Sequence, residues 1–391
     1  MTTVAGGAED SFPYSGRVLR LLAVLAVLVL TGAGCTSPGS SEPSRVPSRE
    51  RLAWTPIPLG RSALPRTLTR SGDAVLVAGE RSERGGYAPA AWVLRGGTAS
   101  GLELRPRSAY AFTADVVSAA FAGDSVALLG RRSGGAHGIP RWTIWSGSVS
   151  GGVDELPQTF ETFGGPASLG LVALATVAGQ PLLLGNWEQD DDRPGPAFWR
   201  ASGSRWARTP AGSGLRTTAR EQHLATGLDV LGDRPVVLGH SVPLGSGHPR
   251  LVPAVWIGDR GGVRLGPAPV AQALDLSCGG ERCLAAVRTP GSGVTVWQVR
   301  ADGRAEALPV PAEARAATWA QVAVAADGGA AVAFGSAGTS ELGRWDVDRR
   351  RWRLATAPEG EVRDLAVVGR QVLAIVGDGT AESAPRRLVH A

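Results

Sequence analysis

The sequence contains no lysine, three cysteines among 391 residues, and no apolar run longer than ten residues. All 40 basic residues are therefore arginines, and they exceed the 35 acidic residues by five. No arginine cluster reaches the density of a nucleic-acid footprint, so we expect no nucleic-acid partner and assign the excess charge to solubility. Apolar residues make up 43% of the chain, which is typical of a globular protein with an ample core.

The longest apolar run lies near the N-terminus. Arg17 and Arg20 precede ten apolar residues, 21–30. A membrane-spanning helix needs about 20 such residues, so the run is too short to span a bilayer. A basic segment followed by a short apolar core is the form of a secretory signal, and we predict that residues 1–34 are a signal peptide.

Small residues, Gly32 to Gly34, stand directly before Cys35. This arrangement resembles the bacterial lipobox, although that family usually has Leu, Val or Ile where Gly32 stands. The resemblance implies cleavage before Cys35, a diacylglyceryl membrane anchor on its thiol, and a position on the outer face of the cytoplasmic membrane. The alternative is an ordinary secreted protein. Residues 35–50 are rich in Ser and Pro and are expected to form a flexible anchored linker.

The other two cysteines, Cys278 and Cys283, flank a Gly-Gly pair. An even pair in an oxidising compartment predicts a disulfide across a hairpin, with two free thiols as the alternative. A zinc site would need two further ligands nearby, and this stretch contains none.

A short motif recurs seven times along the chain: an apolar stretch, a glycine turn, and a second apolar stretch. The turns lie at residues 71–73, 122–124, 178–180, 231–233, 278–281, 326–329 and 368–370. Gly and Asp tolerate the positive φ that tight hairpins require. The nearly continuous Val, Leu and Ala runs after the turns predict strands buried on both faces.

A tryptophan follows each of the first six turns, in what we predict to be the third strand of each unit. These residues are Trp92, Trp145, Trp199, Trp256, Trp297 and Trp345. Their spacing of roughly 40 to 60 residues fits a four-stranded blade. We therefore predict an all-β, seven-bladed β-propeller over residues 51–391, present as a monomer; six or eight blades remain open.

The seventh unit supplies only three strands before the chain stops. Residues 51–60, RLAWTPIPLG, look like a fourth strand that lacks the preceding three. We predict that this N-terminal strand completes the last blade and closes the ring, which removes exposed sheet edges.

The tryptophan hairpins ASGSRW (201–206) and WDVDRRRW (345–352) resemble the Asp-box of sialidase-type (BNR) propellers. The first keeps the serine, glycine and tryptophan of that motif, and the second keeps the aspartate. The arginine-only, Ala- and Gly-rich usage is similar to that of actinobacterial proteins. Together these features resemble the Trp-rich, Asp-box-like propellers of secreted actinobacterial lipoproteins.

The loops between second and third strands are the strongest pointers to function. They are long and are expected to share one face of the ring, where aromatic and arginine side chains commonly anchor interfaces. The candidate binding residues are Arg84, Tyr87, Arg131, Arg132, His137, Trp187, Glu188, Asp191, His240, His248 and Arg250. Unselected loop growth is the alternative. The three histidines could also form a composite metal or proton-transfer site, but we expect no metal and no cofactor.

The expected function is a lipid-anchored platform that binds an envelope protein or a glycan. The alternative is a sialidase-like glycoside hydrolase or lyase, which would use an arginine cluster, a tyrosine nucleophile and an acid. Tyr87 and Tyr110 are the two tyrosines that follow Cys35, and neither stands in a matching motif. Ser241 is not expected to be catalytic, because Pro243 occupies the position where a nucleophile elbow needs glycine.

Overall fold

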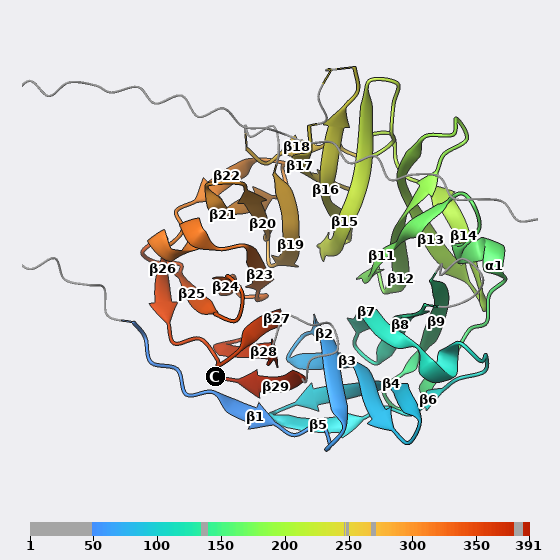
Figure 1. Cartoon of the computed structure of the whole chain (residues 1–391), viewed down its shortest axis with the longest axis horizontal. Coiled ribbons are helices and arrows are strands. Elements are labelled where there is room, and N and C mark those ends of the chain that lie inside the picture. Colours follow the sequence, from blue (N-terminus) through green and yellow to red (C-terminus); the bar gives the residue numbers. More distant parts are fainter. Residues whose placement is uncertain (1–48, 134–139, 246, 248–249, 267–270, 379–385) are drawn as a thin grey trace, which may run out of the picture. The chain divides into compact units, whose positions relative to one another are not determined.

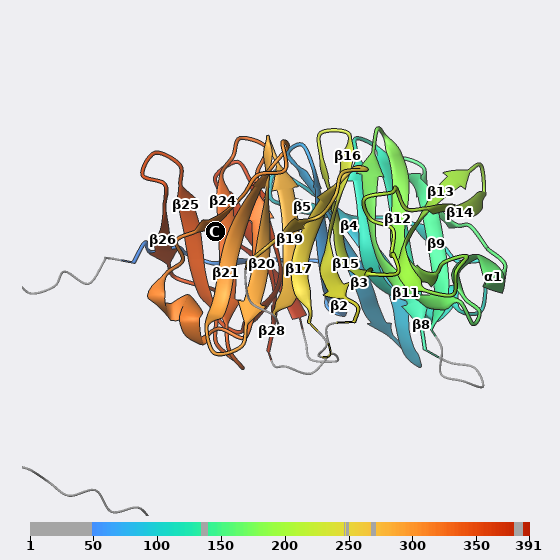
Figure 2. The ribbon, with the colours of Figure 1, turned by 90° about the horizontal axis from the view of Figure 1, so that it is seen from above.

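The computed structural model describes residues 49–133, 140–245, 247, 250–266, 271–378 and 386–391. Seven sheets stand as blades around a central axis (Figure 1). In the side view their strands run between the two faces of the ring (Figure 2). The predicted all-β, seven-bladed propeller is therefore confirmed, and the count of six or eight blades is excluded.

Each blade begins at the centre of the ring and continues outwards. The innermost strands are β2 (Ala63–Ser71), β7 (Asp115–Ala122), β11 (Ser168–Val177), β15 (Glu221–Leu231), β19 (Gln272–Gly279), β23 (Trp319–Val324) and β27 (Glu361–Val368). The second strands are β3 (Ala74–Glu83), β8 (Ser125–Arg132), β12 (Gln180–Glu188), β16 (Arg234–Pro243), β20 (Arg282–Thr289), β24 (Ala330–Gly335) and β28 (Gln371–Gly377). Every innermost strand pairs with its second strand in antiparallel fashion.

The third strands are β4 (Gly86–Arg95), β9 (Arg141–Ser148), β13 (Pro194–Ser202), β17 (Val252–Ile257), β21 (Gly293–Arg300), β25 (Glu341–Asp346) and β29 (Arg386–His390). The outermost are β5 (Thr98–Gly101), β10 (Gly152–Glu155), β14 (Arg205–Pro210), β18 (Val263–Arg264), β22 (Ala305–Leu308), β26 (Arg351–Ala355) and β1 (Thr55–Ile57). A short strand, β6 (Leu104–Arg105), adds to the second blade in parallel with β10. The short helices η1 (Ala111–Thr113), α1 (Phe160–Phe163) and η2 (Ala312–Ala316) lie in connections between blades.

The recurring glycine turns join the first and second strands of every blade. Each contains one glycine whose φ lies between 54° and 85°, a region that disfavours other residues. These glycines are Gly72, Gly123, Gly179, Gly232, Gly280, Gly328 and Gly369. The predicted hairpins are therefore confirmed at all seven positions.

The core lies between neighbouring blades. The second strands are nearly continuously buried, as predicted from their apolar runs. Trp145 and Trp199 of the third strands are fully buried and pack among the side chains of the preceding blade, for example Leu76 and Leu129. Large rings at these positions bury much apolar area, which explains why the tryptophan hairpin recurs.

The ring closes between the two ends of the described chain. β1 pairs with β29, with Thr55 opposite His390 and Ile57 opposite Leu388. The indole of Trp54 donates a 2.7 Å hydrogen bond to the carbonyl of Thr356 in the sixth blade. The predicted closure by an N-terminal strand is confirmed.

Cys278 and Cys283 face each other across the β19–β20 hairpin and form a disulfide, as predicted. The predicted signal peptide, residues 1–34, and Cys35 lie outside the described residues. The domain boundaries at 34 and 50 stay predictions.

Candidate functional site

The two faces of the ring differ in how the strands are joined. One face, which we call the turn face, carries the tight turns between first and second strands and between third and fourth strands. The other, the loop face, carries the connections between second and third strands and those from one blade to the next, including η1, α1 and η2. Binding residues commonly lie on connections that a rigid scaffold positions.

Exposed large hydrophobic side chains gather on the loop face. In the described part of the chain there are eight such residues: Tyr87, Tyr110, Phe112, Phe160, Leu169, Leu244, Leu251 and Val347. Val347 lies on the turn face between β25 and β26, and the other seven lie on the loop face. Phe112, in η1, is 56% exposed, and Phe160, in α1, is 41% exposed.

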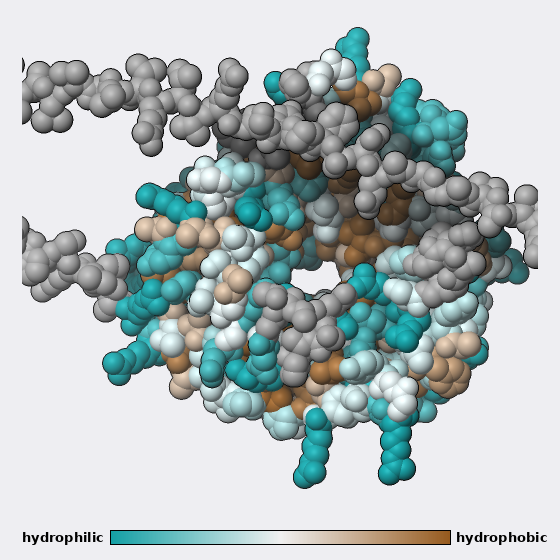
Figure 3. All heavy atoms as spheres, viewed as in Figure 1, coloured by the Kyte–Doolittle hydropathy of each residue, from teal (hydrophilic) through white to brown (hydrophobic). Residues whose placement is uncertain are grey.

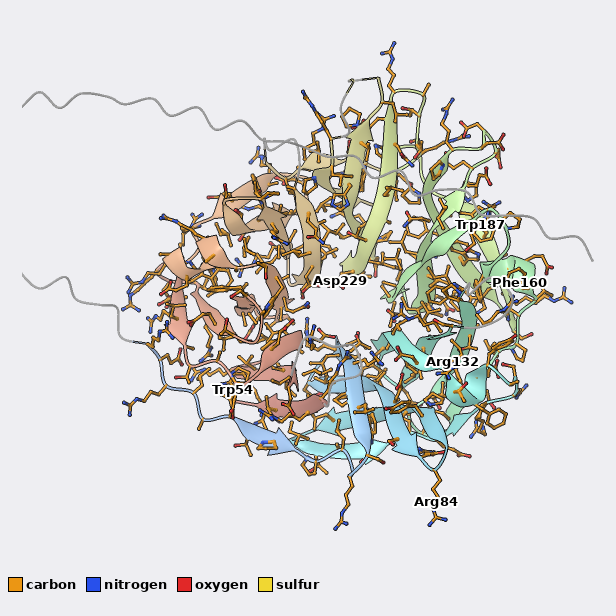
Figure 4. All side chains as sticks on the ribbon, viewed as in Figure 1. Trp54, Arg84, Arg132, Phe160, Trp187 and Asp229 are labelled. Atoms are coloured by element: carbon orange, nitrogen blue, oxygen red, sulfur yellow. A yellow bond between two sulfur atoms is a disulfide. The ribbon has the colours of Figure 1, made fainter. Side chains whose placement is uncertain are left out.

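Several predicted binding residues do lie exposed on the loop face. Arg84 occupies the β3–β4 turn and projects from the ring (Figure 4), and Tyr87 follows it at 42% exposure. Arg132 ends β8, and Arg250 precedes β17. Asp191 is also exposed and pairs with Arg193 at 3.2 Å.

The structure corrects the placement of Trp187. Its side chain is 8% exposed, with its ring edge-on against Trp199 at 5.6 Å and beneath the guanidinium of Arg208 at 5.0 Å. Trp187 lies within β12, whose register turns it into the blade interface, so it is a core residue rather than a surface anchor. The neighbouring Glu188 is half-buried at the end of that strand.

The placement of His240 on a loop is also wrong. His240 lies within β16, is 9% exposed, and its Nε2 accepts a 3.0 Å hydrogen bond from the backbone of Ala273. Burial lowers its pKa. His137 and His248 lie outside the described residues. Within the described residues no group of three His, Cys, Asp or Glu side chains is arranged to hold a metal.

A buried charge cluster between the first two blades was not visible in the sequence. Arg66 contacts Glu80 at 3.2 Å and also pairs with Asp115. Arg131, predicted as a surface residue, is half-buried and acts electrostatically on Asp115. Burial and the neighbouring Glu80 carboxylate raise the pKa of Asp115, and Arg66 opposes that rise. Arg66 stands at a bulge of β2, and the cluster joins side chains of the first blade to Asp115 of the second.

Ser241 belongs to a second polar cluster, in the fourth blade. It is buried, and its hydroxyl donates to Glu221, while His223 stands 3.7 Å from the other carboxylate oxygen. Arg264 also binds Glu221 at 2.9 Å. In a catalytic triad the histidine binds the serine and the acid binds the histidine. Here the carboxylate stands between them, which agrees with the expectation that Ser241 is not a nucleophile.

The centre of the ring holds a cavity of ≈ 500 Å³ that is lined by the innermost strands, and Figure 3 shows its opening. Asp229, Asp275 and Asp364 line it; Asp229 is labelled there in Figure 4. Each accepts a hydrogen bond from the backbone of the next blade: from Cys278 at 2.6 Å, Val322 at 2.7 Å and Leu68 at 2.7 Å. These aspartates therefore link neighbouring blades through hydrogen bonds, and we do not assign them to a ligand site.

Burial raises the pKa values of these three carboxyl groups. The pKa of Asp275 rises to about 7, and those of Asp229 and Asp364 rise to about 6. The charges of Asp364 and Asp229 add to the shift of Asp275. The environment of the channel therefore disfavours the ionised form of these carboxyl groups.

A second cavity, the rim pocket, opens on the loop face at the second blade. It has a volume of ≈ 310 Å³ and lies beside α1. Aromatic residues Tyr110, Trp142, Phe160 and Phe163 line it together with Arg141. The sequence did not reveal this pocket, because Tyr110 and Phe160 stand in connections between blades and not in the loops within blades.

No family model and no curated protein matches this chain. Among solved structures, its fold is similar to that of the acylaminoacyl peptidase of Pyrococcus horikoshii, with a TM-score of 0.52 at 12% identity over 84% of this chain and 51% of that chain. Puromycin hydrolase gives a TM-score of 0.52 at 16% identity over 84% and 52%.

This chain thus spans about half the length of these two hydrolases. At such identities the likeness shows a shared propeller fold alone. The class of protein is therefore a seven-bladed β-propeller with four-stranded antiparallel blades. The sialidase-type, lipoprotein and actinobacterial parts of the resemblance stay predictions.

Proposed function

We propose that this propeller is a binding platform whose loop face holds an envelope protein or a glycan. The carrying observation is the unequal distribution of exposed apolar side chains, seven on the loop face against Val347 alone on the turn face within the described residues. Scattered exposed apolar residues are ordinary on soluble proteins, whereas their concentration on one face is typical of an interaction surface.

The side chains on this face also have the right chemistry for an interface. Exposed Tyr and Phe rings share this face with the exposed arginines Arg84 and Arg132, and aromatic and arginine residues are enriched where binding energy concentrates. The ring behind them is held by seven hydrophobic clusters, so the face needs little reordering to bind.

We place the platform at the outer face of the cytoplasmic membrane, anchored through Cys35, with the Ser- and Pro-rich residues after it as the linker. The described residues include no helix of sufficient length and apolarity to span a bilayer. Replacing Cys35 with Ser should release the protein from membranes on fractionation. Full retention of the C35S protein on membranes would contradict the lipid anchor.

The binding proposal is tested by crosslinking and capture from native envelopes. A Tyr87→Ala/Phe112→Ala/Leu244→Ala protein should lose the captured partner, since these side chains are exposed and support no core cluster. Val347→Ala is the matched control on the turn face and should capture as the unaltered protein does. Equal capture by both variants would overturn the assignment of the face.

The alternative, a sialidase-like glycoside hydrolase or lyase, finds one partial feature in the cluster of Arg66, Arg131, Glu80 and Asp115. The tyrosine that this chemistry uses is not part of it: in the described residues the Tyr110 ring faces Arg141 at 5.8 Å. Turnover of a fluorogenic sialoside or uronide that is abolished by Asp115→Asn would favour the enzyme over the platform.

A further inference from the structure

Three segments build the walls of the rim pocket. Ser108 and Tyr110 come from the connection between the first and second blades, Trp142 and Ile144 come from β9, and residues 155–160 continue from β10 into α1. Figure 4 shows Phe160 at the outer edge of the ring. The pocket volume of ≈ 310 Å³ is at the lower end of the range for ligand sites, which suits a side chain and its neighbours.

Arg141 is the cation of this pocket. Its guanidinium lies 4.2 Å from the centre of the Phe160 ring and 5.8 Å from that of Tyr110. Its Nε is buried and has no hydrogen-bond partner, and no described carboxylate forms an ion pair with it. The rings hold the planar group in place without neutralising its charge.

Three other polar side chains at the pocket, those of Glu155, Gln158 and Thr143, are already bonded within the protein. Glu155 is 2% exposed and accepts 2.6 Å hydrogen bonds from the backbone of Arg107 and Ser108. Gln158 binds Ser204 and Trp206, and the Thr143 hydroxyl accepts from Trp145. The pocket therefore offers an unpaired guanidinium on apolar walls. A sugar, which needs several hydrogen bonds, fits this lining less well than a carboxylate beside apolar groups.

We propose that the rim pocket receives an acidic side chain, Asp or Glu, from an extended segment of a protein partner. This rests on the proposed function and names the chemistry that the platform recognises. The surface favours a segment that continues past the pocket, because exposed apolar residues lie on both sides of it: Phe112 towards the first blade and Leu169 on the third. An aromatic or aliphatic neighbour of the acidic residue covers these side chains.

The carboxylate is bound by the guanidinium through paired N–H donors, and the rings around Arg141 exclude water from the bond. Arg141 is held by rings before binding, so less side-chain freedom is lost when the partner arrives. Binding of the carboxylate requires both the charge and the planar shape of the Arg141 guanidinium, which distinguishes this site from a purely apolar groove.

The test is selection of linear heptapeptides from a displayed random library on the intact protein, in parallel with Arg141→Gln and Arg208→Gln proteins. Arg208 is the matched control, since it also covers an aromatic ring, that of Trp187 at 5.0 Å, but lies outside the pocket. Melting temperatures of all three proteins establish that they fold, and Arg141→Lys replaces Arg141→Gln if the latter does not.

We expect the intact and Arg208→Gln proteins to enrich peptides in which Asp or Glu stands next to an aromatic or aliphatic residue. The affinity of a selected peptide for the Arg141 variant should be at least tenfold lower than for the intact protein. Replacing the acidic residue of that peptide by its amide should lower its affinity for the intact protein by the same factor. No enrichment, enrichment of peptides without an acid, or equal binding to the Arg141 variant would overturn the proposal.

Capture from envelopes separates this inference from the proposed function. If the Tyr87→Ala/Phe112→Ala/Leu244→Ala protein loses its partner while the Arg141→Gln protein retains it, the platform stands and the acidic-peptide pocket is wrong. If neither loses the partner, both are wrong.

Discussion

Single residues in the central channel show how neighbouring blades are held together. Asp275 accepts a hydrogen bond from the backbone of Val322 in the next blade, and its side chain is half-buried in the wall of the channel. The hydrogen bond favours an ionised carboxylate, but burial opposes the charge more strongly, so the pKa rises to about 7. The folded ring therefore keeps a proton that the unfolded chain releases near pH 4.

This proton makes stability depend on pH. Because the folded pKa is raised, the contribution of Asp275 is fully present below about pH 4 and is lost as the pH rises through 7. The difference between the pKa of Asp275 in the unfolded chain and about 7 in the folded ring corresponds to at most on the order of 4 kcal/mol. In Asp275→Asn, which keeps an acceptor for Val322, we expect the fall in melting temperature between pH 4 and pH 7.5 to be smaller than in the unaltered protein.

Asp233→Asn, at the exposed β15–β16 turn, is the control and should leave the pH dependence unchanged. The melting temperature of Asp275→Asn should still fall in part as the pH rises, because the pKa values of Asp229 and Asp364 are also raised. Identical slopes for Asp275→Asn and Asp233→Asn would show that the buried proton is absent.

At this scale the sequence was least informative. Trp187 and His240 stand in segments with loop-like composition, yet both are buried because a strand continues past its apolar run. The face of the sheet to which a side chain points depends on the strand register, and a shift of one residue moves the side chain to the opposite face. Arg66 and Asp115 meet only where the innermost strands of neighbouring blades pack together, which no local sequence pattern predicts.

At the scale of elements, the short strand β1 determines whether the ring closes. Its residue Ile57 is 5% exposed and packs among Leu373 and Leu388 of the last blade, while Thr55 in the same strand points to solvent. Trp54 adds a hydrogen bond to the sixth blade. Closure by this strand covers an edge that would otherwise be open.

Removing this strand should weaken the whole ring. We expect a chain that begins at Ser62 to melt roughly 5–10 °C lower, since it loses buried apolar area and a strand pairing. Ile57→Ala alone should cost about 2–5 kcal/mol, while Thr55→Ala should have almost no effect. The measurement is thermal unfolding followed by circular dichroism. An unchanged melting temperature for the shortened chain would refute the closure.

The elements themselves were largely predictable. Glycine turns and apolar runs marked all seven hairpins because tight turns and doubly buried strands require those residues. The connections between blades were not predicted, since α1 and η1 are short and carry no periodic pattern. The rim pocket lies between such connections, so it became visible only once the blades were placed.

At the scale of the whole molecule, the two faces of the ring differ in the residues that they carry. The turn face is limited by hairpin geometry to short turns rich in Gly and Asp. The loop face is free of that limit and carries Phe112, Phe160 and Arg141. The exposed aromatic rings and arginines of the loop face are the reason for assigning the binding role to that face.

Hydroxyl-radical footprinting of the protein in native envelopes, compared with the purified protein, tests this claim most directly. Oxidation of Tyr87, Tyr110, Phe112 and Phe160 should fall severalfold in the envelope, while Val347 on the turn face stays equally reactive. If each face were oxidised to the same extent in the envelope and in the purified protein, this would contradict the binding platform. Protection of Val347 alone would assign the partner to the turn face.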